Sequence, residues 1–535
     1  MRAIAFLIIT FLCGCEMLEK NPINDELIGD SSTLYSEKYR PQFHFSPQDN
    51  WMNDPNGMVY YQGEYHLFYQ YHPESTVWGP MHWGHAISKD LVHWEQFPIA
   101  LYPDEHGTIF SGSAVVDWNN TSGFGTKDNP PLVAIYTYHN AEGEKLGKID
   151  FQTQGIAYSL DKGRTWIKYS QNPVMANPGI KDFRDPKVSW HQESQKWVMV
   201  LAQDDHIGIY SSPNLIDWQL ESNFGKEWGV HAGVWECPDL IKMPIEGTNE
   251  FKYALLVSIN PGGPNGGSAT QYFIGDFDGK TFTLTSDFED DVKPITVNNE
   301  VTESGVWLDY GTDNYAGVTF SDVPEEDGRR LFIGWMSNWL YANQVPTEKW
   351  RSAMTIPRAL TIVKTNVGLR VASTPVEELS KIVKQKEFYQ KLSGESNYNL
   401  VNAHKNAKLH HLEFDVNPLN SNSIKLIFDN ELGEKTSINL DVTSGDIIFD
   451  RSLSGDISFD SKFANIQKAI TTPKLSKYRF NIYVDTSSFE IFVNDGETVI
   501  TSIVFPTKPY SSVNIEADSE IILENIMISE LKSIW

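Results

Sequence analysis

The chain has 535 residues and a formal net charge of -27, and 13% of its residues are aromatic. A chain of this length is expected to form two or more domains with a large core. The acidic balance argues against nucleic-acid binding and against docking by charge on an anionic membrane surface, so a neutral substrate fits better. Its many aromatic rings suit an all-β core and also packing against the apolar face of a sugar.

The N-terminus has the pattern of a targeting segment rather than of a folded element. Arg2 forms a short positive region, and the apolar run that follows, from Ala3 to Leu12, is too short to span a bilayer as a stable helix. The run ends in the tetrapeptide LCGC, which resembles the lipobox of bacterial lipoproteins. This resemblance implies a signal peptide over residues 1–15 and a lipid-bearing Cys15, whereas an ordinary signal peptide is the alternative.

A polar and acidic tether is expected over residues 16–38, between the lipid and the first domain. The protein would then be a membrane-anchored bacterial lipoprotein on the periplasmic or cell-surface side, touching the membrane only through its lipid. With Cys13 removed and Cys15 acylated, Cys237 is the thiol that is left, so no internal disulfide framework is predicted. The oligomeric state stays open.

Short β-branched and aromatic runs, separated by Gly, Pro, Asn and Asp, fill the region from Phe43 to about Leu360 and predict many short strands. A loose repeat accompanies them, because four strand ends are each followed by a polar turn and an aromatic residue, namely Trp94, Trp166, Trp218 and Phe282. Spacings of roughly 50 to 70 residues are near those of propeller blades. Coincidence among aromatic-rich hairpins is the alternative. A ring of blades would bring polar strand ends together at a central funnel.

The strand pattern is interrupted over residues 366–390, which are predicted to form a linker with one helical stretch. From residue 391 to residue 535 alternating strands return, and this pattern suits a two-sheet sandwich. We expect this second domain to support the first one, with an accessory sugar-binding role as the alternative.

Three carboxylates in Pro-bounded motifs are the candidates for chemistry: Asp54 in WMNDPNG, Asp185 in DFRDPKV and Glu236 in GVWECPDLI. We expect them in turns at strand ends, where rigid neighbours fix their rotamers. Turn chemistry for Asp54 and a surface ion pair between Arg184 and Asp185 are the ordinary alternatives. The apolar neighbours of Glu236 would favour its protonated form, which a general acid needs.

Three acids in three blade-like units serve glycoside hydrolysis better than other chemistries. That reaction needs one carboxylate at the anomeric carbon and one protonated carboxyl at the leaving oxygen, and a third can bind sugar hydroxyls in the transition state. The His residues are scattered without metal-ligand spacing, and a Ser nucleophile elbow is missing. The glycine-rich segment Asn260–Thr270 precedes no helix and is predicted to be a mobile surface loop rather than a phosphate loop.

The three motifs, in this order, resemble the signature blocks of glycoside hydrolase family 32, the β-fructofuranosidases that include invertases, inulinases and levanases. Further blocks are similar to the bacterial levanase and exo-inulinase branch, such as WGPMHWGHAISKDLVHWE and RRLFIGWMSNWLYANQVPTEKWRSAMTIPR. The similarity covers about residues 39–535 and is strong up to Arg358. It implies an all-β fold, with a five-bladed β-propeller over residues 39–365 and a C-terminal β-sandwich over residues 391–535.

The resemblance also implies roles for the matching residues. Asp54 would attack C2 of a fructosyl unit, Glu236 would act as acid and then as base, and Asp185 would bind fructosyl hydroxyls in the transition state. A covalent intermediate of this kind implies retention of configuration, with the two catalytic carboxyls about 5 Å apart. No metal or organic cofactor is implied. Other positions that match the lining of the fructose pocket are Asn53, Gln70, Trp78, Phe110, Ser111, Arg184 and Trp335.

The leading hypothesis is an exo-acting enzyme that releases terminal fructose from levan or inulin, with sucrose and fructo-oligosaccharides as further candidates. An endo-levanase is the alternative within the enzymes and would need an open cleft in place of a pocket. A non-catalytic fructan-binding surface lipoprotein is the alternative of another class. Such a binding protein, or an adhesive propeller, would have no need for all three acids.

Overall fold

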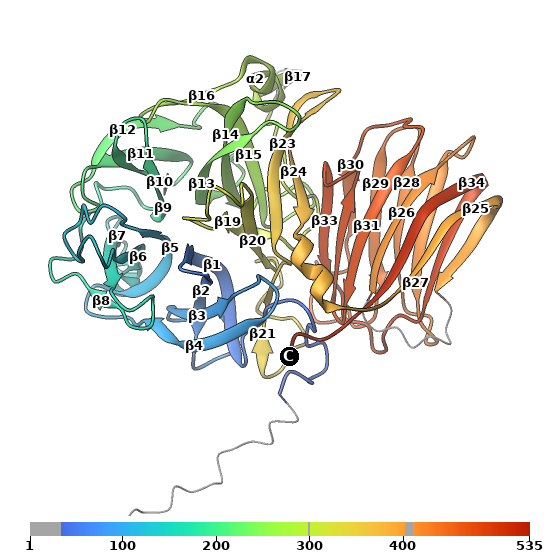
Figure 1. The fold of residues 1–535 in the computed structure, drawn as a ribbon, viewed down its shortest axis with the longest axis horizontal. Helices are drawn as coiled ribbons and strands as arrows, with labels where there is room; N and C mark the ends of the chain where they lie inside the picture. Colours follow the sequence, from blue (N-terminus) through green and yellow to red (C-terminus); the bar gives the residue numbers. More distant parts are fainter. Residues whose placement is uncertain (1–33, 298–299, 402–409) are drawn as a thin grey trace, which may run out of the picture.

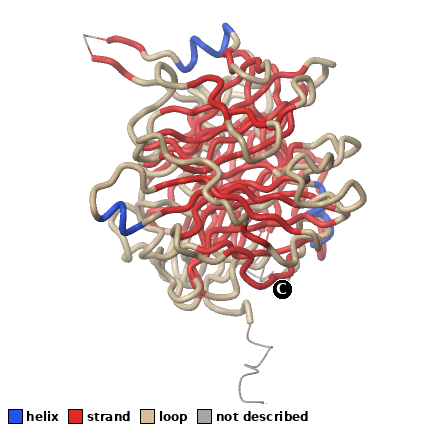
Figure 2. Tube along the Cα trace, turned by 90° about the vertical axis from the view of Figure 1, so that its left-hand side faces the viewer, coloured by secondary structure: helices blue, strands red, loops and turns tan. Residues whose placement is uncertain are grey.

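The computed structural model describes residues 34–297, 300–401 and 410–535, and nearly all regular structure there is β-strand (Figures 1 and 2). Five small sheets surround a common axis, and a larger sheet lies beside them on the right of Figure 1. The prediction of an all-β chain, with a five-bladed propeller followed by a sandwich, is confirmed. Within these ranges no helix is long and apolar enough to cross a membrane. The predicted signal peptide, Cys15 and most of the predicted tether lie outside the described residues.

The first four blades are antiparallel sheets with the first strand at the axis. Blade one holds β1 (Asn50–Tyr61), β2 (Glu64–His72), β3 (His82–Ser88) and β4 (Trp94–Leu101). Blade two holds β5 (Thr108–Val116), β6 (Leu132–His139), β7 (Gln152–Ser159) and β8 (Ile167–Lys168). Blade three holds β9 (Phe183–His191), β10 (Lys196–Gln203), β11 (His206–Ser212) and β12 (Gln219–Phe224). Blade four holds β13 (Val234–Pro244), β14 (Phe251–Asn260), β15 (Ala269–Phe277) and β16 (Phe282–Leu284).

The fifth blade closes the ring. It holds β19 (Tyr315–Thr319), β20 (Arg330–Met336), β23 (Arg358–Thr365) and β24 (Gly368–Pro375), and β22 (Ala353–Met354) pairs with β20. From the same part of the chain, β21 (Trp350–Arg351) pairs in parallel with β1 and so ties the last blade to the first. The short elements between strands are α1 (Ala141–Lys145), α2 (Ser286–Val292), β17 (Ile295–Val297) and β18 (Glu300–Thr302).

The aromatic repeat marks the beginning of the outermost strand in four blades. Trp94 and Phe282 are the first residues of β4 and β16, while Trp166 and Trp218 directly precede β8 and β12. In each Trp, Nε1 donates to the carbonyl oxygen three residues earlier, at 3.0–3.1 Å. The same hydrogen bond in three blades shows that the repeat is structural and not a coincidence.

The predicted linker at residues 366–390 is instead divided between the two domains. β24 completes the fifth blade, the 3-10 helix η3 (Glu377–Ile382) supplies the helical stretch, and β25 (Val383–Val401) begins the second domain. Strand periodicity was hidden because β25 is largely exposed and rich in Lys, Glu and Gln. The passage between the domains is therefore one short 3-10 helix.

The second domain is a sandwich whose layers are joined by one long strand. β34 has 20 residues and pairs with β25, β26 and β27. Alternate residues of β27 are buried in an apolar core, as expected for a strand with one inward face. Its strands after β25 are β26 (His410–Asn417), β27 (Ser423–Asp429), β28 (Lys435–Asp441), β29 (Asp446–Leu453), β30 (Ile466–Ile470), β31 (Tyr478–Asp485), β32 (Ser488–Val493), β33 (Thr498–Ile503) and β34 (Ser512–Leu531).

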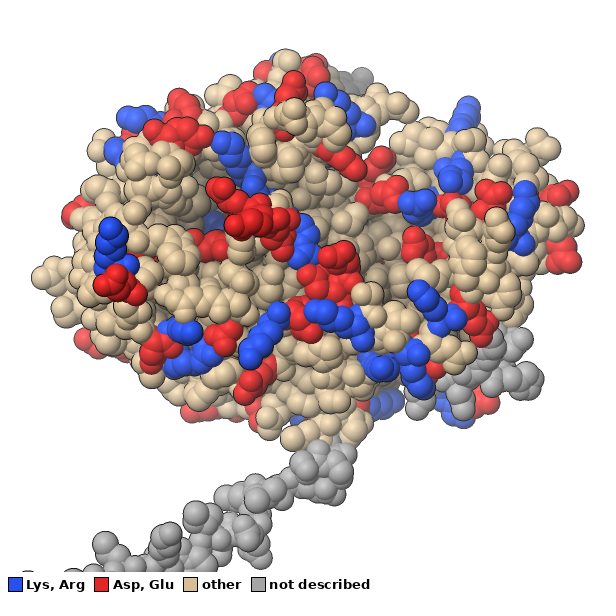
Figure 3. Space-filling view, in the orientation of Figure 1, with Lys and Arg blue, Asp and Glu red and all other residues tan. Residues whose placement is uncertain are grey.

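The surface is mixed in charge despite the acidic total. On the face drawn in Figure 3, basic and acidic side chains are interspersed, and no continuous basic patch forms among the described residues of that face. A basic stripe is the electrostatic footprint of a nucleic-acid-binding protein. This face therefore offers no such footprint.

Buried charges join the propeller to the sandwich. Arg358 of β23 donates to Glu490 of β32 and to Asp309, each at 3.0 Å. The ring nitrogens of His44 lie 2.7 Å from Asp485 and 2.9 Å from Glu490. Burial alone would lower the pKa of His44, but these two carboxylates outweigh it and raise the pKa to about 9. At neutral pH the network thus holds two cations between carboxylates that come from both domains.

Replacing Glu490 by Gln should destabilise the protein strongly. The substitution leaves Arg358 and His44 short of a counter-charge in a buried site, and breaking a buried pair in this way costs about 3–5 kcal/mol. Lys384→Gln is the control, because it removes a sandwich ion pair whose Lys side chain is 57% exposed and should cost about 1 kcal/mol or less. Denaturant unfolding at neutral pH measures both free energies. Equal stability of the two variants would show that the buried network does not hold the domains together.

Candidate active site

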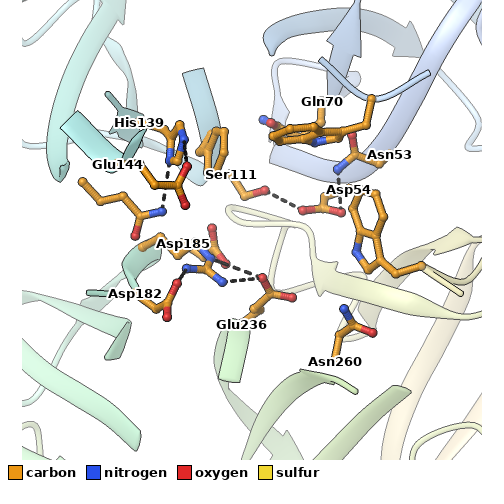
Figure 4. Close-up of a pocket in the computed structure, with 15 residues that line it drawn as sticks. Asn53, Asp54, Gln70, Ser111, His139, Glu144, Asp182, Asp185, Glu236 and Asn260 are labelled. Carbon is orange, nitrogen blue, oxygen red and sulfur yellow. Dashed lines mark hydrogen bonds and ion pairs between the residues drawn. The ribbon is translucent and has the colours of Figure 1, made fainter. Parts of the chain in front are cut away.

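A cavity of about 340 Å³ opens among the inner strands of the propeller (Figure 4). It receives side chains from all five blades, and every predicted catalytic or pocket residue except Trp335 contributes to its wall. The lining residues are Asn53, Asp54, Gln70, Trp78, Phe110, Ser111, His139, Glu144, Gln152, Asp182, Arg184, Asp185, Glu236, Asn260 and Trp339.

A repeated backbone irregularity turns the side chains of the inner strands into this cavity. In β1, Asn53 and Asp54 together face the single residue Gln70 of β2, so that the strand bulges. The same two-against-one pairing occurs in the other four inner strands, at Phe110–Ser111, Asp185–Pro186, Cys237–Pro238 and Ala316–Gly317. Bulges re-aim side chains next to active sites, and they tolerate Pro because the extra residue need not donate to the ladder.

The prediction that the three acids lie in turns at strand ends is wrong. All three lie inside strands, in β1, β9 and β13, and the Pro and Gly residues beside them belong to the bulges or flank them. Asp185 and Cys237 have φ angles of 66° and 45°, in a region that residues other than Gly enter rarely. The paired strands on either side hold this conformation.

Asp54 is fixed by two close side-chain donors, and the Cys237 thiol lies 3.8 Å from its Oδ2. Asn53 Nδ2 donates to Oδ1 at 3.0 Å, and Ser111 Oγ donates to Oδ2 at 2.7 Å. Burial raises the pKa of Asp54 to about 6, with a contribution from the Glu236 carboxylate, although both hydrogen bonds oppose the shift. Above pH 6 the side chain is thus a positioned, poorly solvated carboxylate, as a nucleophile should be.

Asp185 lies deeper and is also electrostatically perturbed. Its Oδ2 accepts a hydrogen bond from the Cys237 backbone N–H at 3.0 Å, and Arg184 Nε lies 3.9 Å from the same oxygen. Burial raises the pKa of Asp185 to about 7, because it outweighs the opposing effect of Arg184 and is reinforced by Glu236 and Asp54. The ordinary alternative of a surface ion pair does not describe this buried residue.

Glu236 faces polar partners and not the apolar ones that its neighbours in sequence suggested. Arg184 donates to Oε1 from Nη2 at 2.6 Å and from Nε at 3.2 Å, and the Tyr315 hydroxyl donates to Oε2. The neighbouring Trp235 and Cys237 are buried, as expected. The same guanidinium also binds Asp182.

Five carboxyl groups line this cavity, and three of them share one guanidinium. Asp182, Asp185 and Glu236 lie within ion-pair distance of Arg184. Burial and the repulsion between neighbouring carboxylates raise the pKa of Asp54 to about 6 and that of Asp185 to about 7, so these two acids bind protons more tightly than ordinary Asp residues do. A site that keeps one carboxyl protonated while another is ionised meets the basic requirement for acid-assisted nucleophilic displacement.

The predicted aromatic wall is formed by a different Trp. Trp335 is fully buried in β20, and its indole packs on that of Trp339 at a ring-centroid distance of 4.8 Å and on that of Trp51 at 6.1 Å. Trp339, in the loop after β20, is the residue that lines the cavity. Trp335 thus supports the wall from behind.

Six lining residues were missed by sequence reasoning: His139, Glu144, Gln152, Asp182, Asn260 and Trp339. Asp182 and Trp339 stand inside the quoted motifs and could have been found there. Asn260 begins the segment predicted to be a mobile surface loop, which is wrong for this residue because it ends β14 and lines the cavity. His139, Glu144 and Gln152 carry no motif, since β6, α1 and β7 bring them together only in the folded chain.

A five-bladed propeller with clustered carboxyls at its centre defines a propeller-type glycoside hydrolase. Residues 44–375 match the family described as "Glycosyl hydrolases family 32 N-terminal domain", and residues 376–530 match "Glycosyl hydrolases family 32 C terminal". The chain belongs to glycosyl hydrolase family 32. The division between the two matches falls directly after β24.

Several relatives cover nearly the whole chain. A levanase of Bacillus subtilis (strain 168) is 49% identical over 511 residues, which are 94% of this chain and 72% of that protein. An extracellular exo-inulinase of Aspergillus niger is 41% identical over 498 residues, 88% of this chain and 90% of that one. The crystal structure of exo-inulinase from Aspergillus awamori has a TM-score of 0.84 at 38% identity and covers 94% of this chain and 100% of its own. A variant fructofuranosidase from Schwanniomyces occidentalis, complexed with fructosylnystose, has a TM-score of 0.82 at 34% identity, with 93% and 99% coverage.

The value of kcat/KM should fall as the pH drops below about 6. If Asp54 is the nucleophile, as the resemblance implies, only its carboxylate form is reactive, and its pKa of about 6 means that protonation removes this form below that pH. Ser111→Ala should move this acid limb to higher pH, because it removes a hydrogen bond that favours the ionised form. A pH–rate profile from about pH 4 to pH 8 at low substrate concentration tests both statements. An acid limb near 3.8, the ordinary pKa of Asp, would contradict them.

Proposed function

We propose that the protein is a retaining, exo-acting β-fructosidase that releases terminal fructose from fructans. The observation that carries the proposal is the meeting of Asp54, Asp185 and Glu236, from three separate blades, in one compact cavity. Its volume of about 340 Å³ is at the lower end of small-molecule sites, which suits the end of a chain better than its middle. Relatives named levanase and exo-inulinase support levan and inulin as substrates.

In the proposed reaction, Asp54 attacks C2 of the terminal fructosyl unit as the bond from C2 to the leaving oxygen breaks. Glu236 gives its proton to that oxygen, and the products are a covalent fructosyl ester of Asp54 and the shortened chain. Glu236 then removes a proton from water, whose oxygen attacks C2 and frees fructose and the Asp54 carboxylate. Asp185 accepts hydrogen bonds from fructosyl hydroxyls, and these bonds strengthen in the transition state.

Two alternatives are less well supported. An endo-levanase needs an open cleft that accepts the middle of a chain, whereas the cavity here is compact. A non-catalytic fructan-binding protein would gain nothing from several poorly solvated carboxyls, because a neutral sugar does not compensate their charge. Sucrose and short fructo-oligosaccharides remain further candidate substrates.

The cellular location of the protein is proposed from the sequence alone. The tetrapeptide LCGC at the end of the apolar run suggests acylation of Cys15 and a membrane-anchored bacterial lipoprotein, on the periplasmic or cell-surface side. A Cys15→Ala protein should then lose its membrane association while its soluble form keeps the activity.

A time course of products tests the proposed function. Purified protein without residues 1–15 is incubated with levan and with inulin separately, and Glu236→Ala serves as the inactive control. Fructose as the first and continuing product supports exo action and shows the preferred linkage. Oligosaccharides at the earliest times would replace the proposal by endo action, and no release from polymers, sucrose or oligosaccharides would leave the binding-protein alternative.

A further inference from the structure

A line of hydrogen bonds runs along one wall of the cavity and ends at a carboxylate (Figure 4). The Phe183 backbone N–H donates to Gln152 Oε1 at 2.9 Å, which fixes which end of the Gln152 amide is the donor. Gln152 Nε2 lies 3.3 Å from His139 Nδ1, so Nδ1 is the acceptor and Nε2 of His139 carries the proton. That Nε2 lies 3.2 Å from Glu144 Oε2.

His139 is held as a neutral donor in this line. Burial lowers the pKa of His139, with a further contribution from Arg184, although Glu144 opposes the shift. The ring is stacked on that of Phe110, with centroids 4.1 Å apart and planes within 2° of parallel. An imidazole that is fixed in tautomer and orientation positions its carboxylate partner in the same way that second-shell groups position ligands.

The exposure of the acids grows from the floor of the cavity to its mouth. The side chain of Asp185 is 7% exposed, that of Glu236 is 19% exposed, and that of Glu144 is 50% exposed. The proposed reaction breaks a bond at the level of Glu236, with the fructosyl ring on the buried side. The leaving sugar must therefore point toward the mouth, where Glu144 lies.

Glu144 has no role in the proposed reaction, although neighbouring groups hold it in place. Glu144 belongs to α1, an insertion between β6 and β7 whose N-cap is Asn140, and the Asn140 side chain accepts from the Gly143 N–H at 2.8 Å. A solvated position on a short helix would be the ordinary explanation. That explanation does not account for a buried Gln152 that fixes the tautomer of a buried His139, whose other ring nitrogen contacts this carboxylate.

We propose that Glu144 is a specificity-determining residue that accepts hydrogen bonds from the sugar on the leaving side of the scissile bond. His139 and Gln152 are positioning residues that hold its carboxylate in place. A carboxylate has four acceptor sites, and His139 uses one of them, so oxygens remain for the hydroxyls of a neutral sugar. This inference rests on the proposed fructosidase function.

The test compares two kinds of leaving group in the protein without residues 1–15. One substrate is 1-kestose, whose leaving group is a disaccharide, and the other is methyl β-D-fructofuranoside, whose leaving group is too small to reach Glu144. Glu144→Ala should lower kcat/KM for 1-kestose by about 10- to 100-fold, the usual effect of losing a hydrogen bond to a charged group. It should change kcat/KM for the methyl fructoside and inhibition by fructose by less than about twofold, since neither uses the leaving-sugar site.

The control is Glu142→Ala, because Glu142 lies on the same short helix, is exposed and does not line the cavity. His139→Phe keeps a ring that can stack on Phe110 but removes the donor. It should therefore lower the ratio of kcat/KM for 1-kestose to kcat/KM for the methyl fructoside, as Glu144→Ala does. That ratio would not move if His139 were merely structural. An unchanged ratio in Glu144→Ala, or an equal fall for both substrates, would overturn the inference. Failure of the unsubstituted protein to release fructose from either substrate would overturn the proposed function itself, and the inference with it.

Discussion

Asp54→Asn should lower kcat by a factor on the order of 10⁴ or more, because the amide cannot form the covalent fructosyl ester through which the reaction is proposed to pass. The protein should stay folded, since Asn is nearly isosteric and can still bond with Asn53 and Ser111. Steady-state release of fructose from levan or sucrose measures the effect. Asp49→Asn is the matched control, an exposed acid just ahead of β1, and it should keep nearly full activity. Turnover within about tenfold of normal in Asp54→Asn would remove Asp54 from the nucleophile role.

The same substitution should stabilise the protein near neutral pH. Because burial raises the pKa of Asp54 from 3.8 to about 6, the folded state binds the proton more tightly than the unfolded state does. Stability is therefore lost as the pH rises through this window, on the order of 1–3 kcal/mol at neutral pH. Asp54→Asn removes this penalty, so its thermal midpoint should exceed that of the unsubstituted protein near pH 7. The difference should vanish as the pH approaches the lower end of the window.

Glu236→Gln should slow hydrolysis according to the leaving group. Sugars leave poorly without a proton, so kcat for sucrose or levan should fall by about 10²–10⁴. Fructosyl fluoride needs no protonation to leave, so its first step should be nearly unaffected, and added azide should speed the release of the fructosyl unit by replacing the water that Glu236 would activate. Rapid-mixing kinetics with both substrates measures this difference.

Asp185→Asn is the matched comparison for Glu236→Gln, because both residues lie close to Arg184 in the same cavity. If Asp185 only stabilises the transition state through fructosyl hydroxyls, its amide variant should slow sucrose and fructosyl fluoride alike, without rescue by azide. The comparison is needed because Arg184 and Tyr315 both donate to Glu236. If the effect of Asp185→Asn depended on the leaving group and that of Glu236→Gln did not, Asp185 would be the general acid and Glu236 the residue that binds fructosyl hydroxyls.

The fold could be predicted because its signals are local and repeated. Short β-branched runs and the aromatic residues Trp94, Trp166, Trp218 and Phe282 each report on one blade, and the structure places all four at the beginning of an outermost strand. Bulges were not recognised, because a Pro beside an Asp has the same letters in a turn as in a bulge. Whether such a segment forms a turn or a bulge depends on how it pairs with the neighbouring strand, and a short stretch of sequence does not show this pairing.

The candidate site also has one part that could be predicted from the sequence and one part that could not. Its buried floor comes from motifs that are continuous in sequence, so Asp54, Asp185 and Glu236 could be named at once. The mouth is assembled from the ends of strands and an insertion. His139 and Glu144 meet there because α1 directly follows β6, and Gln152 reaches His139 through the pairing of β6 with β7. Trp335 and Trp339 share one motif, and only their burial tells which of them faces the cavity.

The most direct test of the proposed reaction is to trap the intermediate and locate it. Glu236→Gln protein is mixed with fructosyl fluoride, quenched in acid, digested and examined by mass spectrometry. A peptide that contains Asp54 should carry the mass of one fructosyl unit, and the adduct should disappear when azide is added before quenching. An adduct on another residue, or a first-formed sugar of inverted configuration in the NMR spectrum of unsubstituted protein, would contradict a retaining mechanism with Asp54 as the nucleophile.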